Sequence, residues 1–259
     1  MDLGIAGRKA IVCASSRGLG RGCAMALAAE GCEVIVNGRD PKQLDITAAE
    51  IRAATGATVI AVEADVGTKE GQDKLFAACP EPDILVNNNA GPPFRDFREL
   101  DREKMIQGLI ANMMTPIELI QRAIDPMVKR RFGRIVNITS SSVKAPIPGL
   151  DLSSGARAGL TSFLAGVART VAASNVTINN ILPGSFDTDR LKSNIEATAK
   201  KRNVGLDVIR GERLAAIPAR RFGVPDEFGA ACAYLCSAQA SYITGQNLLI
   251  DGGAFPGAF

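Results

Sequence analysis

Residues 133–163 carry the side chains best suited to chemistry. Three serines, Ser140, Ser141 and Ser142, follow an apolar run, and a hydroxyl can donate a hydrogen bond to a substrate oxygen. Asp151, Lys144 or a water can then carry protons, although the serines can equally bond loop backbone and Asp151 can cap a helix. The chain contains no histidine, which excludes Ser-His-Asp and Cys-His catalysis and the usual zinc sites. No metal site is predicted.

A glycine-containing turn at residues 14–20, Ala-Ser-Ser-Arg-Gly-Leu-Gly, is the first candidate binding site. It follows an expected strand and opens an expected helix, so backbone N–H groups and the helix dipole favour a phosphate there. This context predicts a dinucleotide site. Its candidate cofactor-binding residues are Ala14, Ser16, Arg17, Gly18, Leu19 and Gly20.

Cofactor choice is read where the second expected strand ends, because an acidic residue there binds the ribose of NAD. This chain has the neutral sequence Val-Asn-Gly at 36–38, followed by Arg39. Arg39 and Arg17 can bind a 2′-phosphate through their planar guanidinium groups. We therefore predict NADP(H), with NAD(H) as the alternative, although Arg39 at a strand end can also simply face solvent.

Asn112 precedes Pro116 by four residues within an expected helix at 101–130. Proline has no N–H to donate to the carbonyl four residues earlier. The sequence therefore predicts a kink and a free main-chain carbonyl at Asn112.

Short apolar runs alternate with helical patterns along the whole chain. This alternation predicts an α/β fold: a single-domain, doubly wound parallel sheet of about seven strands, Rossmann-like, with helices on both faces, over residues 1–259. The expected strands are 9–14, 33–37, 58–63, 83–87, 134–139, 176–182 and 247–251. The expected helices are 18–30, 41–54, 68–78, 101–130, 152–173, 190–215 and 225–237.

The composition of the chain limits the kinds of partner that it is expected to bind. The net charge of +3 over 259 residues favours neither a nucleic acid nor a membrane surface, and no apolar run is long enough to span a bilayer. The N-terminus lacks a signal-peptide pattern, so a cytoplasmic location is expected, with a small molecule as substrate. The six cysteines form no CxxC pair and are predicted to be reduced packing residues.

These motifs together resemble the short-chain dehydrogenase/reductase family over almost the whole chain. The turn is similar to the family's TGxxxGxG, with Cys13-Ala14 in place of Thr-Gly. The run at 87–91 resembles the NNAG motif that closes over the cofactor, and 183–188 resembles PGxxxT, which approaches the nicotinamide. The resemblance adds these cofactor-binding residues: Asp65 and Val66 beside adenine, then Asn88, Ala90, Gly91, Pro183, Gly184 and Thr188.

The same resemblance places the family's catalytic positions. Its serine falls on Ser140, and its asparagine, whose main-chain carbonyl holds a relay water, on Asn112. Its tyrosine and lysine positions fall on Ser153 and Arg157, and Arg157 is also a candidate for cofactor binding. Serine is far less acidic than tyrosine, and arginine keeps its proton, so the standard relay is absent.

The chain resembles most a subgroup similar to β-ketoacyl carrier-protein reductases that lacks this YxxxK pair. An NADP(H)-dependent oxidoreductase acting on a carbonyl or secondary alcohol is expected. The alternatives are a non-redox lyase, isomerase or dehalogenase-type enzyme, or an inactive NADP-binding regulator or partner subunit. The resemblance also implies a homotetramer or homodimer.

A substrate-covering insertion is expected at about 189–217. Residues 189–221 contain nine basic and four acidic residues. This excess suits an anionic substrate, although a solvated helix face explains it too.

Overall fold

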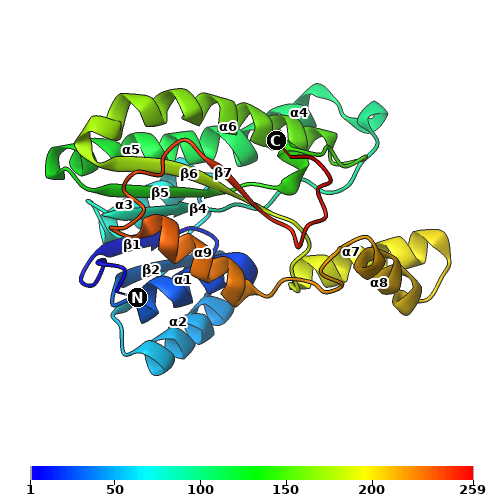
Figure 1. The fold of residues 1–259 in the computed structure, drawn as a ribbon, viewed down its shortest axis with the longest axis horizontal. Coiled ribbons are helices and arrows are strands. Elements are labelled where there is room, and N and C mark those ends of the chain that lie inside the picture. Colours follow the sequence, from blue (N-terminus) through cyan, green and yellow to red (C-terminus); the bar gives the residue numbers. More distant parts are fainter. Residues whose placement is uncertain (1, 259) are drawn as a thin grey trace.

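A seven-stranded sheet organises the molecule, for which a computed structural model describes residues 2–258 (Figure 1). All neighbouring strands run parallel, in the order β3-β2-β1-β4-β5-β6-β7. The predicted fold class and all seven predicted strands are confirmed, with ends that differ by one or two residues. The strands are β1 (Lys9–Val12), β2 (Glu33–Gly38), β3 (Val59–Glu63), β4 (Ile84–Asn87), β5 (Gly133–Ile138), β6 (Val176–Pro183) and β7 (Asn247–Ile250).

Helices cover both faces of the sheet. Helices α1, α2 and α9 pack on one face, and α3, α5 and α6 pack on the other (Figure 1). Helices α7 and α8 extend to one side and share a small core of their own. The helices are α1 (Gly18–Ala29), α2 (Pro41–Thr55), α3 (Lys69–Ala78), α4 (Arg102–Leu109), α5 (Thr115–Arg130), α6 (Asp151–Val171), α7 (Asp189–Arg202), α8 (Leu206–Ala215) and α9 (Pro225–Cys236).

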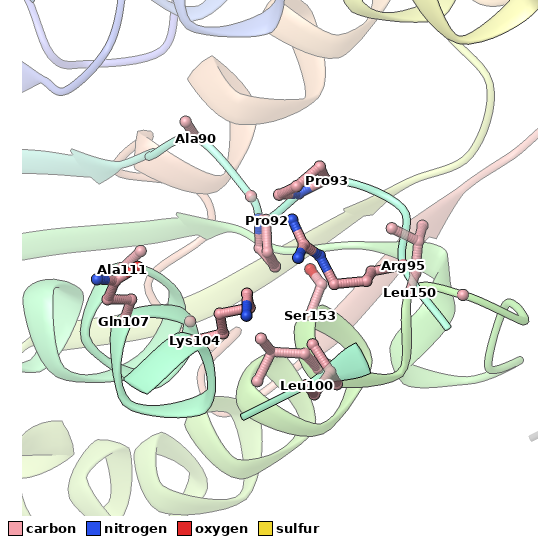
Figure 2. A pocket seen from close by; sticks show the side chains of 14 residues that line it. Ala90, Pro92, Pro93, Arg95, Leu100, Lys104, Gln107, Ala111, Leu150 and Ser153 are labelled. Atoms are coloured by element: carbon pink, nitrogen blue, oxygen red, sulfur yellow. The ribbon is translucent and has the colours of Figure 1, made fainter. Parts of the chain in front are cut away.

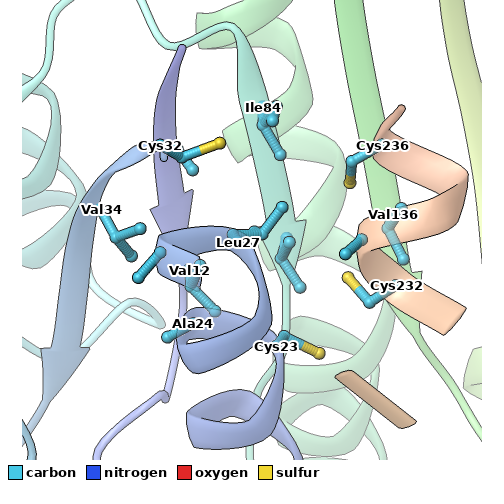
Figure 3. Packing of buried hydrophobic residues seen from close by; sticks show 14 of the residues in the cluster. Val12, Cys23, Ala24, Leu27, Cys32, Val34, Ile84, Val136, Cys232 and Cys236 are labelled. Atoms are coloured by element: carbon cyan, nitrogen blue, oxygen red, sulfur yellow. The ribbon is translucent and has the colours of Figure 1, made fainter. Parts of the chain in front are cut away.

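The core forms because both sides of each central strand are apolar. In β1, Val12 faces the α1/α9 layer while Ile11 faces the α5/α6 layer, as expected where successive side chains alternate. All six cysteines are buried and reduced, as predicted. Cys232 and Cys236 lie on one face of α9, and Cys23 projects from α1 into the same cluster (Figure 3).

The prediction of one continuous helix at 101–130 is wrong. The segment is divided into α4 and α5 by a π-helical turn at Ile110–Met114 (η2), in which Thr115 N–H donates to Ile110 O five residues earlier. Pro116 lies in the first turn of α5 and has no N–H, so the chain widens the preceding turn where a simple kink was predicted.

The helix predicted at 190–215 is also two helices. Asn203 takes a left-handed backbone (φ 53°) and ends α7, and Gly205 precedes α8. None of the described helices is long and apolar enough to cross a membrane.

The strand order places the functional residues. It reverses between β1 and β4, and in open α/β sheets the ligand crevice lies at the carboxyl ends of the strands where the order reverses. The turn after β1 and the loop after β4 therefore face the same crevice.

Candidate functional site

The phosphate turn, residues 14–20, is held in place by side chains of the neighbouring strands. Ala14 N–H donates to Asn37 Oδ1 (3.1 Å), and Asn88 Nδ2 donates to Ala14 O (3.1 Å). Buried Ser15 donates to Val12 O (2.7 Å) and accepts from Asn37 N (2.9 Å). These bonds fix the turn from β2 and β4 at once. The sequence did not predict the structural roles of Ser15 and Asn37. The available signal was their position at the ends of two expected buried strands, beside the glycine-containing turn.

The turn fits a dinucleotide diphosphate. Arg17 precedes α1 and makes no side-chain capping bond, and the first turn of α1 carries no acidic residue, so its N–H groups and positive dipole are available to an anion. A Cβ on Gly20 would lie 2.4 Å from Ala14 O, so only glycine allows this close approach of helix and turn. A Cβ on Gly18 would lie 3.5 Å from Thr188 Cγ2, which brings the predicted PGxxxT motif to the phosphate turn.

Arg39 directly follows β2, Arg17 directly precedes α1, and both side chains are exposed. Arg39 pairs with Asp65 (3.6 Å), and Arg17 pairs with Asp40 (3.5 Å) and Asp189 (3.8 Å). Exposed pairs of this length contribute little, so a phosphate can replace these carboxylates. The position before Arg39 is Gly38, where a Cβ would meet Ser16 at 2.9 Å. An acidic side chain that would select NAD is absent from this position, and one placed there would require Ser16 to shift.

The asparagines after β4 brace the loop that follows. Asn88 bonds the phosphate turn, while Asn89 Nδ2 donates to Ala111 O (3.2 Å). Asn112 Nδ2 donates to Ala90 O (3.2 Å), so the π-helical turn holds the Ala90–Gly91 backbone.

Three of the four predicted catalytic residues form one buried hydrogen-bond chain. Ser153 Oγ donates to Asn112 Oδ1 (3.1 Å) and accepts from Arg157 Nε (3.2 Å), while Arg157 Nη1 donates to Ile138 O (2.8 Å). The π-helical turn, α6 and β5 each supply one part of this chain. Asn112 takes part through its side-chain oxygen, where the sequence predicted its main-chain carbonyl.

Ser140 lies outside this chain. Its Oγ accepts from Ser142 N (3.1 Å), which caps a 3₁₀ turn, and the hydroxyl proton remains available to a ligand. Asp151 is in the first turn of α6 and accepts from Gly149 N (3.2 Å), so the predicted N-cap position is one residue off; the N-cap is Leu150. Lys144 lies over the Phe255 ring (5.8 Å).

Two guanidinium groups meet at the Gly91 backbone. A Cβ on Gly91 would lie 3.0 Å from Arg190 Nη2 and 3.5 Å from Arg157 Nη2. Burial, together with the positive charge of Arg190, lowers the pKa of Arg157 to about 10, and partial burial lowers the pKa of Arg190. Both groups stay charged at neutral pH. In the sequence Arg190 is one member of the basic segment at 189–221, and no local signal marks its approach to Gly91.

A pocket of about 260 Å³ opens beside these residues (Figure 2). Its wall is mainly apolar, and Arg95 extends its side chain toward the middle of the pocket. Ser153 and Gly91 both line it, so the hydrogen-bond chain reaches the pocket surface. The other lining residues are Ala90, Pro92, Pro93, Leu100, Lys104, Gln107, Gly108, Ala111, Gly149, Leu150 and Leu152.

The remaining predicted cofactor residues lie around the same crevice. Gly184 packs against Asp251, where a Cβ would come within 2.6 Å, and Pro183 ends β6. Thr188 caps α7 by accepting from Leu191 N (3.4 Å). Val66 is buried in the core, so only its backbone can reach a ligand.

Several known proteins are similar to this chain in sequence and in fold. A family model described as enoyl-(acyl carrier protein) reductase matches residues 13–254. The chain is 36% identical over 253 residues to a 3-oxoacyl-[acyl-carrier-protein] reductase of Synechocystis, covering 94% of this chain and 95% of that one. It is 29% identical over 252 residues to the NADPH-dependent reductase BacG of Bacillus subtilis, covering 95% and 97%.

A solved structure agrees in fold. L-sorbose reductase from Gluconobacter frateurii, complexed with NADPH and L-sorbose, superposes with a TM-score of 0.93 at 26% identity, covering 99% of this chain and 100% of that one. The sequence matches, the seven-stranded sheet and the glycine turn after β1 lead to one assignment. This chain belongs to the short-chain dehydrogenase/reductase family.

Proposed function

We propose that this protein is an NADP(H)-dependent oxidoreductase that interconverts a carbonyl and a secondary alcohol. The uncapped α1 terminus, Gly20 and the Arg17/Arg39 pair support the cofactor, as do NADPH-dependent relatives and an NADPH complex among similar structures. When bound, the nicotinamide supplies or accepts the hydride. Reduction then consumes one hydride and one proton per carbonyl.

The buried chain of Asn112, Ser153 and Arg157 is the observation that carries the reaction. The single proton of Ser153 is donated to Asn112, and one oxygen lone pair accepts from Arg157 Nε. Ser153 therefore positions Arg157, and the Nη2 group of Arg157 is left to donate to a substrate oxygen. Ser153 and Arg157 occupy the positions where the family resemblance places tyrosine and lysine.

Arg157 stabilises the alkoxide through its fixed positive charge. A preorganised donor in a water-poor site stabilises developing negative charge strongly, because it does not reorganise during the step. Arg157 keeps its proton at neutral pH, so the proton that completes reduction comes from water. A cavity of about 20 Å³, lined by Asn112 and Arg157, has room for one water. Two buried oxygens of this cavity, Asn87 Oδ1 and Thr115 Oγ1, lack a partner among the described residues.

Cofactor binding and turnover test the proposal in sequence. The purified protein should quench or enhance NADPH fluorescence with a micromolar dissociation constant and bind NADH more weakly. It should then oxidise NADPH at 340 nm with at least one member of a panel of aliphatic ketones, hydroxy ketones and oxo acids. Binding without turnover on any of these would overturn the oxidoreductase proposal and support an NADP-responsive regulator. Failure to bind either nucleotide at millimolar concentration would support a non-redox enzyme.

A further inference from the structure

The strongest unexplained feature of the crevice is the convergence of Arg157 and Arg190 on Gly91. Arg157 belongs to α6 and Arg190 to the first turn of α7, so two separate elements bring like charges to one point. Arg157 is buried, whereas Arg190 is an exposed residue whose guanidinium lies beside Gly91. Two like charges that converge on one point, one of them buried, repel each other, and an anion bound between them relieves that repulsion.

No carboxylate within residues 2–258 forms an ion pair with either arginine. The nearest acids in sequence are engaged elsewhere: Asp189 faces Arg17 (3.8 Å) and Asp187 faces Lys192 (4.0 Å). Other arginines of the same region do have partners, as in the pair Arg202–Glu212. The two guanidinium groups at Gly91 are therefore a basic site with unused donors.

The adjoining pocket narrows the choice of anion. Gly91 and Ser153 line it, and among its lining residues, all within the described chain, none is acidic. Its apolar wall and volume of about 260 Å³, below the usual range for drug-sized ligands, suit a short carbon chain. Neither arginine is among the residues lining this pocket, but both reach its edge: Arg157 Nε donates to Ser153 Oγ (3.2 Å), and the Nη2 groups of Arg157 and Arg190 lie beside Gly91.

We propose that Arg190 binds the carboxylate of the substrate while Arg157 Nη2 donates to its carbonyl oxygen, and that the substrate is a short 2-oxo or 3-oxo acid or the corresponding hydroxy acid. This inference rests on the proposed oxidoreductase function. The reacting carbonyl lies against Arg157 Nη2, and the carboxylate lies against the Arg190 guanidinium, one or two carbons away. During reduction the carbonyl carbon gains the hydride and its oxygen gains the proton, NADPH becomes NADP⁺, and the carboxylate is unchanged.

Matched acids and esters test the anion site. The substrates are 2-oxopentanoate against its methyl ester, and acetoacetate against methyl acetoacetate. We expect the native protein to prefer an acid over its ester by about 10- to 100-fold in kcat/KM, the effect of one charged bidentate contact. Arg190→Gln should abolish this preference by raising KM for the acid, and Arg190→Lys should restore part of it. Lys201→Gln removes the same charge from an exposed position of α7 and should leave the preference intact.

Binding measurements distinguish a substrate carboxylate from the cofactor diphosphate as the anion that Arg190 binds. Calorimetric titration of the NADP⁺-loaded protein with oxamate, a stable carboxylate probe, should show binding that Arg190→Gln abolishes. The dissociation constant of NADPH, measured without substrate, should change less than threefold in Arg190→Gln. A tenfold or larger loss of NADPH affinity would assign Arg190 to the cofactor diphosphate and overturn the carboxylate site.

The same experiments distinguish failure of the carboxylate site from failure of the oxidoreductase proposal. Equal turnover of acids and esters by the native protein would overturn this inference while leaving the oxidoreductase proposal in place. Absence of turnover with both, despite NADPH binding, would refute the oxidoreductase and the substrate assignment together.

Discussion

The two sides of the crevice use their polar groups in opposite ways. In the phosphate turn, the side chains of Ser15, Asn37 and Asn88 bond backbone atoms, and the backbone N–H groups at α1 remain for the ligand. In the opposite basic wall, formed by Ser153, Arg157 and Arg190, the two guanidinium groups keep donors for the ligand and Ser153 positions one of them. We infer that the first side recognises what all dinucleotides share, whereas the second can specify one substrate.

This difference predicts two classes of mutational effect. Changes in the basic wall should affect turnover and leave the fold intact, whereas changes in the phosphate turn should affect stability and cofactor affinity together. The substitutions below test this division, from the largest expected effect to the smallest.

Arg157→Leu should have the largest effect. It removes the donor and charge proposed to stabilise the alkoxide, so kcat should fall about 100- to 1,000-fold, as for loss of one oxyanion-hole donor. Arg157→Lys keeps a charge and should recover part of this loss. Steady-state kinetics with NADPH and the best ketone of the panel give the measurement, and circular dichroism confirms the fold. A kcat unchanged in Arg157→Leu would contradict the proposed role.

The dependence of the rate on pH tests whether the charge of Arg157 is required. Since burial lowers the pKa of Arg157 to about 10, its charged form is lost at lower pH than for an exposed arginine. The rate should therefore be constant for this group below its pKa and fall as pH rises through about 10. Arg157→Lys should move this alkaline limb, because lysine titrates with a pKa of its own. An alkaline limb that is identical in both proteins would assign it to another group.

Gly20→Ala should produce the next effect, in the phosphate turn. The added Cβ would lie 2.4 Å from Ala14 O, so the turn or α1 must shift. We expect a loss of about 1–3 kcal/mol in the free energy of unfolding, typical of overpacking, together with weaker NADPH binding. Gly166→Ala is the control, because its Cβ would meet nothing within 4 Å on α6. Chemical denaturation and fluorescence titration measure both quantities; normal stability with lost NADPH binding would contradict the coupling.

The sequence predicted the phosphate turn better than it predicted the basic wall. Glycines, apolar runs and the Asn-rich loop are local signals, so they located the strands and the phosphate turn. Arg190 reaches Gly91 across the crevice, and nothing local marks that contact. The π-helical turn was recognisable only as an irregularity at Pro116, because proline shows which donor is missing and leaves open how the backbone compensates.

Arg39→Ala tests cofactor choice at the adenosine end. If Arg39 binds the 2′-phosphate, NADPH affinity should fall about 10-fold or more while NADH affinity changes less than twofold. Lys42→Ala, an exposed neighbouring charge on α2, should change neither. Fluorescence titration with both nucleotides is the measurement. Equal losses for the two nucleotides would refute the phosphate contact and leave Arg39 as the partner of Asp65 alone.

Ala14→Gly should give the smallest effect and the opposite sign. Ala14 holds a left-handed backbone (φ 45°), in which a Cβ is unfavourable by about 1 kcal/mol, so glycine should raise the free energy of unfolding by up to that amount. Ala172→Gly is the matched control: at φ −57° the same change should destabilise the protein. If Asn37 and Asn88 define the turn, NADPH affinity should remain within about threefold in Ala14→Gly, because both of their bonds go to the Ala14 backbone. A large change in affinity would mean that the methyl group itself shapes the turn, and that even the side of the crevice built from backbone depends on one side chain.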